Sequence, residues 1–166
     1  MVKNEELLKN IKYLFIILIL FFTACSTKEY KHIEPKIFIL KTTKLKFADL
    51  AYLRHSGDTI ELELFVAGKA MKRIYINNLL CIDEGCMRKS SFNKEYLYKE
   101  YPVELFEHVI LGKKIYKGIN LVYLNGGFEQ KIESKDVAIM YRVDTKGVYF
   151  RDRKNNILIK LKDVKQ

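Results

Sequence analysis

The feature that most constrains the fold is a set of short apolar runs with a two-residue period, separated by turn clusters. Between positions 60 and 66, apolar side chains alternate with Glu61 and Glu63, which is the pattern of a strand with one buried and one wet face. Strands are expected at residues 45–54, 60–66, 71–76, 115–124, 128–132, 137–143, 148–150 and 157–161, with an ambiguous apolar stretch at 37–40. The N-terminal strands are joined by short turns and predict an antiparallel meander.

A helical segment interrupts the strands. Ser91 suits the cap of a helix over residues 92–99, Pro102 suits the first position of a second helix, and Gly112 suits its end. The sequence therefore predicts an α+β, mostly β fold, in which one or two helices cover a curved antiparallel sheet, or half-barrel. A closed barrel and a sandwich remain alternatives.

Two cysteines lie close together in the chain, Cys81 and Cys86, with Gly85 between them. In an exported protein such a pair is typical of a disulfide that holds a hairpin tip in one shape. Free thiols and a metal or redox site are the alternatives. Leu79 and Leu80, next to this loop, are either an exposed apolar tip or a buried strand end.

No constellation of residues points to catalysis. His32, His55 and His108 are far apart in the chain, and the acidic pairs Glu61/Glu63 and Asp83/Glu84 have no histidine or metal-ligand partner at a suitable spacing. We therefore assign no catalytic residue, no metal site and no cofactor, and we expect a protein that is not an enzyme.

Aromatic residues make up 13% of the chain, and most are expected in the core. Some of them could instead line an apolar groove between the curved sheet and its helices, for which Phe106, Val109 and Tyr123 are the candidates. Such a groove would suit acyl chains.

The N-terminus has the layout of a secretory signal: three lysines precede an uncharged apolar run at residues 13–22, which is too short to span a bilayer. The run ends in Phe22-Thr23-Ala24-Cys25. An anchoring helix with an incidental cysteine and an ordinary signal peptide are the alternatives.

These four residues resemble the lipobox of bacterial lipoproteins, with Phe22 in place of the usual Leu. The resemblance implies cleavage before Cys25 and acylation of that cysteine, so that lipid anchors the protein to a membrane. Ser26, rather than Asp, implies an outer-membrane lipoprotein facing the periplasm rather than an inner-membrane one. The predicted divisions are a signal peptide at 1–24, a lipidated linker at 25–36 and a β-rich periplasmic domain at 37–166.

The net charge of +10 becomes +9 when the signal peptide, with three lysines and two glutamates, is removed. The basic residues are spread along the chain, and an exported protein meets little nucleic acid, so we expect no nucleic-acid partner. Anionic lipid head groups are the nearer counter-charge.

The order of elements, together with the closing sequence YRVDTKGVYFRDRKNNILIKL at 141–161, resembles the half-barrel of the lipoprotein-localisation (Lol) receptor family. The resemblance implies a non-enzymatic protein that binds lipid or the acyl chains of lipoproteins. The alternative is a structural or accessory lipoprotein that docks a protein partner in an envelope assembly.

Overall fold

The computed structural model describes residues 32–83 and 85–164, which form one antiparallel sheet and a short helical segment. The first half contains β1 (His32–Lys41), β2 (Lys46–Ser56), β3 (Thr59–Val66), β4 (Lys69–Ile76), β5 (Leu80–Ile82) and β6 (Gly85–Met87). The middle contains α2 (Lys89–Tyr96), α3 (Leu105–Ile110) and the 3-10 turn η1 (Tyr116–Gly118). The second half contains β7 (Leu121–Leu124), β8 (Gly127–Glu133), β9 (Ala138–Asp144), β10 (Gly147–Asp152) and β11 (Ile157–Asp163).

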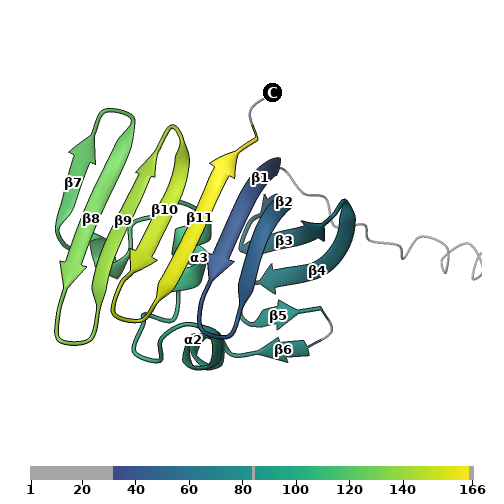
Figure 1. Cartoon of the computed structure of the whole chain (residues 1–166), viewed down its shortest axis with the longest axis horizontal. Coiled ribbons are helices and arrows are strands. Elements are labelled where there is room, and N and C mark those ends of the chain that lie inside the picture. The colour runs from purple at the N-terminus through teal and green to yellow at the C-terminus, as the bar shows by residue number, and fades with distance from the viewer. Residues whose placement is uncertain (1–31, 84, 165–166) are drawn as a thin grey trace, which may run out of the picture.

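The sheet consists of two meanders that pair with each other in its middle, through β1 and β11. Its strand order is β6-β5-β4-β3-β2-β1-β11-β10-β9-β8-β7, so the first and last described strands are neighbours in the middle. The antiparallel β1–β11 ladder runs from Lys36 opposite Asp163 to Lys41 opposite Leu158. The helical segment connects the two outer edges; in Figure 1, α3 is seen behind β10 and β11, and α2 lies at the lower end of the sheet. The predicted class, a curved antiparallel sheet with two helices, is confirmed.

The core lies on the concave face, between the sheet and the helices. Phe38, Tyr141 and Phe150 are completely buried there, and Phe92 of α2 and Val109 of α3 pack from the other side. The described core residues run from Phe38 to Leu161, so a chain that begins at Ser26 retains all of them. We therefore expect residues 26–166 to fold as a unit.

Asp152 attaches the helical segment to the sheet. Its carboxylate, which is fully buried, accepts hydrogen bonds from the hydroxyl of Tyr101 (2.7 Å), the side-chain amide of Asn155 (2.7 Å) and the backbone N–H groups of Ala138 (3.1 Å) and Lys154 (3.0 Å). Burial opposes the charge, but these donors outweigh it and hold the pKa of Asp152 below its usual value.

The predicted strand at 115–124 is wrong in its first half. Residues 116–118 form η1, and Lys117 and Asn120 have positive φ angles of 56° and 52°. The cause is Gln130 of β8, which is buried and accepts from the N–H of Ile115 (3.0 Å) while donating to the carbonyls of Ile115 (3.0 Å) and Ile119 (2.8 Å). One side-chain amide thus fixes a loop that the apolar pattern could not reveal.

The helix starts also differ from the prediction. The first helix begins at Lys89 with Arg88 as its N-cap, and Ser91 lies inside it. The second begins at Leu105, because residues 102–104 form a turn in which Leu105 N–H donates to the carbonyl of Pro102 (3.0 Å). Gly112 does follow the helix, with a φ of +63° that favours glycine.

The predicted linker boundary at residue 36 is wrong for the described part of that segment. β1 begins at His32, which lies opposite His55 of β2, so residues 32–36 belong to the sheet. Pro35 is compatible with this strand although proline has no N–H to donate to a ladder. β1 pairs with β11 only from Lys36 onward, so Pro35 lies outside that ladder.

We predict that Asp152→Ala lowers the free energy of unfolding by about 3 kcal/mol, because several buried donors lose their acceptor. Urea denaturation at neutral pH measures the change. A loss below about 0.5 kcal/mol would contradict the role of Asp152.

The lowered pKa of Asp152 also predicts a pH dependence. A carboxylate whose pKa is lower in the folded state stabilises the fold above its unfolded pKa of about 3.9, and this contribution is lost as pH falls through the folded pKa. The stability of Asp152→Asn should therefore fall less steeply below about pH 4 than that of the wild type, in denaturation series at several pH values.

Candidate functional site

An apolar groove of about 250 Å³ opens on the concave side of the first meander. Its lining is Leu40, Leu45, Lys46, Phe47, Leu64, Val66, Lys72, Ile74, Ile82 and Tyr96. Eight of these residues are apolar or aromatic, and the other two are Lys46 and Lys72. We call the surface that these residues form the concave groove.

Strand periodicity places these side chains together. Leu40 of β1 lies opposite Phe47 of β2, and Ile74 of β4 lies opposite Ile82 of β5, so successive strands contribute to one face. Tyr96, the last residue of α2, closes one side. Its ring lies 5.2 Å from that of the buried Phe92, which anchors the helix. The groove exists because α2 is too short to cover the whole concave face.

The charge at the groove is positive. Lys72 is 3.8 Å from the carboxylate of Asp83, whereas Lys46 has no carboxylate within ion-pair distance in the described part of the chain. An apolar channel beside a lysine is the arrangement that suits an amphiphile with an anionic end.

The predicted groove residues do not form one site. Phe106 and Val109 are buried in the core under the sheet, whereas Tyr123 of β7 is 70% exposed and accepts a hydrogen bond from Lys114 Nζ (3.0 Å). The prediction of a groove at these three residues is therefore corrected. The reason is that the apolar face of α3 packs closely against the second meander, and a sequence pattern does not distinguish a helix that fills a core from one that lines a cavity.

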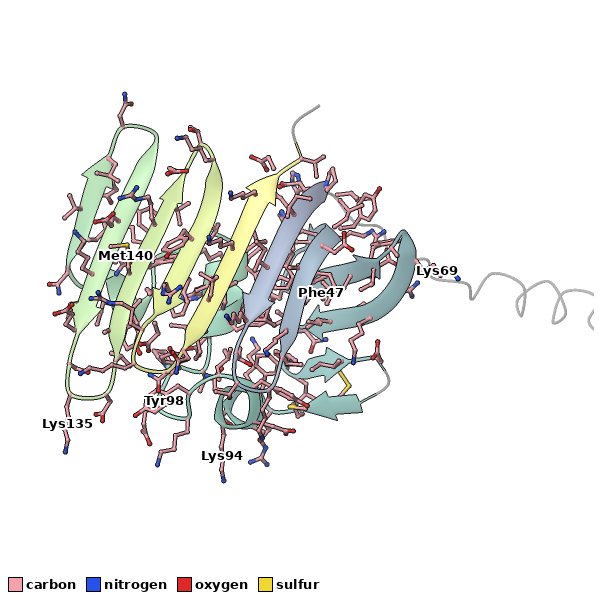
Figure 2. The ribbon with its side chains drawn as sticks, viewed as in Figure 1. Phe47, Lys69, Lys94, Tyr98, Lys135 and Met140 are labelled. Carbon is pink, nitrogen blue, oxygen red and sulfur yellow. A yellow bond between two sulfur atoms is a disulfide. The ribbon has the colours of Figure 1, made fainter. Side chains whose placement is uncertain are left out.

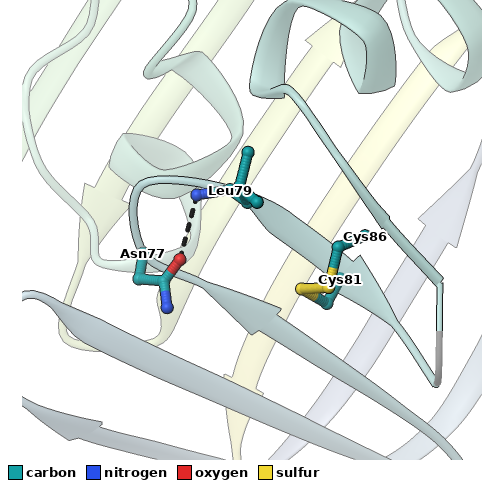
Figure 3. The surroundings of a disulfide bond; sticks show 4 residues. All are labelled: Asn77, Leu79, Cys81 and Cys86. Atoms are coloured by element: carbon teal, nitrogen blue, oxygen red, sulfur yellow. Dashed lines mark hydrogen bonds between the residues drawn. A yellow bond between two sulfur atoms is a disulfide. The ribbon is translucent and has the colours of Figure 1, made fainter.

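The cysteine prediction is confirmed: Cys81 of β5 and Cys86 of β6 form a disulfide between directly paired positions (Figure 3). Of the predicted tip, Leu79 is 42% exposed, with its N–H donating to the side-chain oxygen of Asn77 (2.9 Å). Leu80 is 1% exposed and belongs to the core, because it is the first residue of β5 and faces inward. The tip prediction is therefore corrected for Leu80.

Glu61 and Glu63 were expected on a wet face, but both are buried. Arg54 bridges them, at 3.3 Å from Glu61 and 2.7 Å from Glu63, and Arg73 is 3.2 Å from Glu63. Burial opposes the charge on Glu63, but Arg54 and Arg73 outweigh it and lower its pKa. This cluster is an ion-pair network on the convex side of β2–β4, and it keeps Glu63 in the ionised form.

The histidines are separated in space as well as in sequence, with one exception. The rings of His32 and His55 stack across β1 and β2 with centroids 4.6 Å apart, whereas His108 lies on α3. Within residues 32–83 and 85–164, no three His, Cys, Asp or Glu side chains are grouped so that they could hold a metal ion.

Cys25, the signal peptide at 1–24 and the first part of the linker lie outside the described residues, as does Glu84. None of the helices that the structure describes has both the length and the apolar character needed to cross a membrane.

The function of the site must be inferred from its own geometry, because the chain has no significant match among known proteins. No protein-family model matches the chain, and no curated protein or solved structure matches it significantly.

Sequence reasoning missed the groove itself. The sequence places Leu45 and Phe47 in the predicted strand at 45–54 and Tyr96 in the predicted helix at 92–99, and neither pattern indicates a groove. Two signals were available: Lys46 lies between two apolar residues at a strand start, and the first helix is only two turns long. Both indicate a concave face that is incompletely covered.

We predict that Cys81→Ser/Cys86→Ser destabilises the β5–β6 hairpin locally. Closure of so short a loop is worth about 2 kcal/mol in the chain-entropy model, and the hairpin is at a sheet edge, where it can open without global unfolding. Hydrogen exchange should rise at residues 80–87 and stay unchanged in β9–β11. Equal increases in both regions would contradict a local role.

Proposed function

We propose that this protein is a non-enzymatic envelope lipoprotein that binds an acyl chain in the concave groove. The observation that carries the proposal is the groove, whose lining is mostly apolar and includes Lys46 and Lys72. The curved sheet covered by two helices is compatible with the resemblance to the Lol receptors, and the proposal keeps the anchor on Cys25 and the outer-membrane, periplasm-facing location that the N-terminal sequence favours.

The size of the groove limits its ligand. Its volume of about 250 Å³ is below the roughly 300–1,000 Å³ of complete ligand pockets, so we expect it to hold part of one acyl chain. Each buried methylene contributes about 0.8 kcal/mol, so even a partial chain can bind with useful affinity. An anionic end group of the ligand would lie near Lys46.

The first test is to purify residues 26–166 from the periplasm without detergent and to analyse an organic extract by mass spectrometry. The proposal predicts fatty acid, phospholipid or acylated peptide in the extract. A fluorescent fatty-acid analogue should also bind the delipidated domain and be displaced by unlabelled fatty acid.

A matched pair of variants locates the site. Val66→Trp places a large ring at the mouth of the groove. About two methylenes of the bound analogue would then stay exposed to water, so its binding should weaken about tenfold. Val122→Trp makes the same change at another exposed valine, on β7, and should have no effect. Unchanged binding in Val66→Trp, or equal loss in both variants, would contradict the proposal.

A second candidate function is docking of a protein partner, the alternative that the sequence left open. It is favoured by the edge strand β7, where Val122, Tyr123 and Leu124 are all exposed. An exposed apolar edge can pair with a strand of another protein. An empty organic extract, together with crosslinking of β7 to an envelope protein, would favour this function over acyl binding.

A further inference from the structure

The convex face of the sheet, opposite the helices, combines cationic and aliphatic side chains on its central strands. β1 and β11 are in the middle of the strand order, and on this face they present Ile37, Ile39, Lys160 and Lys162. Because the sheet is curved, the middle strands are the part of this face that a flat partner would meet first. The face is turned toward the viewer in Figure 2, where Met140 is labelled on it.

The strand register fixes these residues as neighbours. Ile37 lies opposite Lys162 of β11 and Leu50 of β2, and Ile39 lies opposite Lys160 and Ala48. The next positions outward from Lys160 are Tyr149 of β10 and then Arg142 of β9. The ammonium group of Lys160 lies 5.1 Å from the centroid of the Tyr149 ring. Lysines, aliphatic residues and one aromatic ring therefore form a continuous patch.

Two shallow depressions lie on this face, and both are bordered by Met140 and Tyr149. One, of about 380 Å³, has four basic residues and one acidic residue in its lining: Arg142, Lys146, Lys160, Lys162 and Asp144. The other, of about 240 Å³, has three basic residues and one acidic residue: Lys131, Arg151, Arg153 and Glu133. Each depression thus carries an excess of positive charge.

The basic residues of this patch are only partly neutralised. Arg142 and Lys131 are both paired with Glu129, and Arg153 is paired with Glu133. Over the ranges that the structure describes, Lys146, Arg151, Lys160 and Lys162 have no carboxylate within ion-pair distance. These four basic side chains are available to bind an external anion.

We infer that the convex face of β1 and β9–β11 binds the surface of an anionic phospholipid membrane. Lipid phosphates would occupy the two basic depressions. Ile37 and Met140, which are 37% and 40% exposed, would enter the boundary between head groups and acyl chains. The long stems of Lys160 and Lys162 allow their charged ends to reach the phosphates while their methylenes stay against the apolar residues.

The mixture of side chains distinguishes a membrane from other anionic partners. A nucleic-acid backbone would be bound by the lysines and arginines alone, whereas exposed isoleucine and methionine between the cations gain free energy only against an apolar phase. β1 also begins at His32, seven residues after Cys25, so an extended chain of about 25 Å at most connects them. This last argument depends on the proposed anchor; the others are independent of it and of the groove.

The test uses residues 26–166, which lack both the apolar run and the lipidated cysteine, in sedimentation with vesicles. We expect binding to phosphatidylglycerol–phosphatidylcholine vesicles that weakens as salt is raised, and no binding to phosphatidylcholine alone. Lys160→Gln/Lys162→Gln should bind about thirtyfold more weakly, since each lysine near such a surface contributes about a fivefold factor. Ile37→Ser should weaken binding severalfold without changing the charge.

The control is Lys94→Gln/Lys117→Gln, which removes the same charge from two exposed lysines of the helical segment. It should bind like the wild type. Equal loss in both double variants, equal binding to neutral vesicles, or an unchanged Ile37→Ser variant would overturn the inference. Binding to an oligonucleotide but not to anionic vesicles would also overturn it, in favour of a nucleic-acid partner. The vesicle experiment does not measure fatty-acid binding in the concave groove. A negative result with vesicles would therefore overturn the membrane inference without contradicting the acyl-binding proposal.

Discussion

The pairing of β1 with β11 is the interaction on which the rest of the structure depends. The hydrogen bond between Lys36 and Asp163 joins residues 127 positions apart, whereas the other strand pairs of the sheet are successive along the chain. Forming this ladder closes a loop of almost the whole domain, so its entropic cost is the largest of any strand pair in the sheet. The same step joins the two meanders into one core. It also forces the helical segment to cross the concave face, because that segment must connect the two outer edges of the sheet.

The two faces of the sheet consequently differ in character. On the concave side, α3 packs closely under the second meander, whereas α2 covers the first meander incompletely and leaves the concave groove. On the convex side, the central strands carry lysines beside isoleucines, whereas on β2–β4 Arg54 and Arg73 are paired with Glu61 and Glu63. The acyl-binding proposal rests on the first face and the membrane inference on the second.

Much of the fold could be predicted from sequence, because apolar alternation and turn residues report local structure directly. The strand at 60–66, the helix end at Gly112 and the Cys81–Cys86 disulfide follow from such local signals. The turn fixed by Gln130 and the burial of Glu63 could not be predicted, since both depend on side-chain contacts that only the folded sheet creates, Gln130 with Ile115 and Glu63 with Arg73. The groove was placed at the wrong residues for the same reason: how closely a helix covers a sheet depends on the geometry of both, and periodicity describes only one face at a time.

The most direct test of the central claim is an NMR titration of isotope-labelled residues 26–166 with a fatty acid that carries a spin label on its chain. Acyl binding in the concave groove predicts line broadening of amides around Phe47, Val66 and Ile82, with β7 and the convex strands unaffected. Broadening at β7 or on the convex face, or none at saturating ligand, would contradict the account.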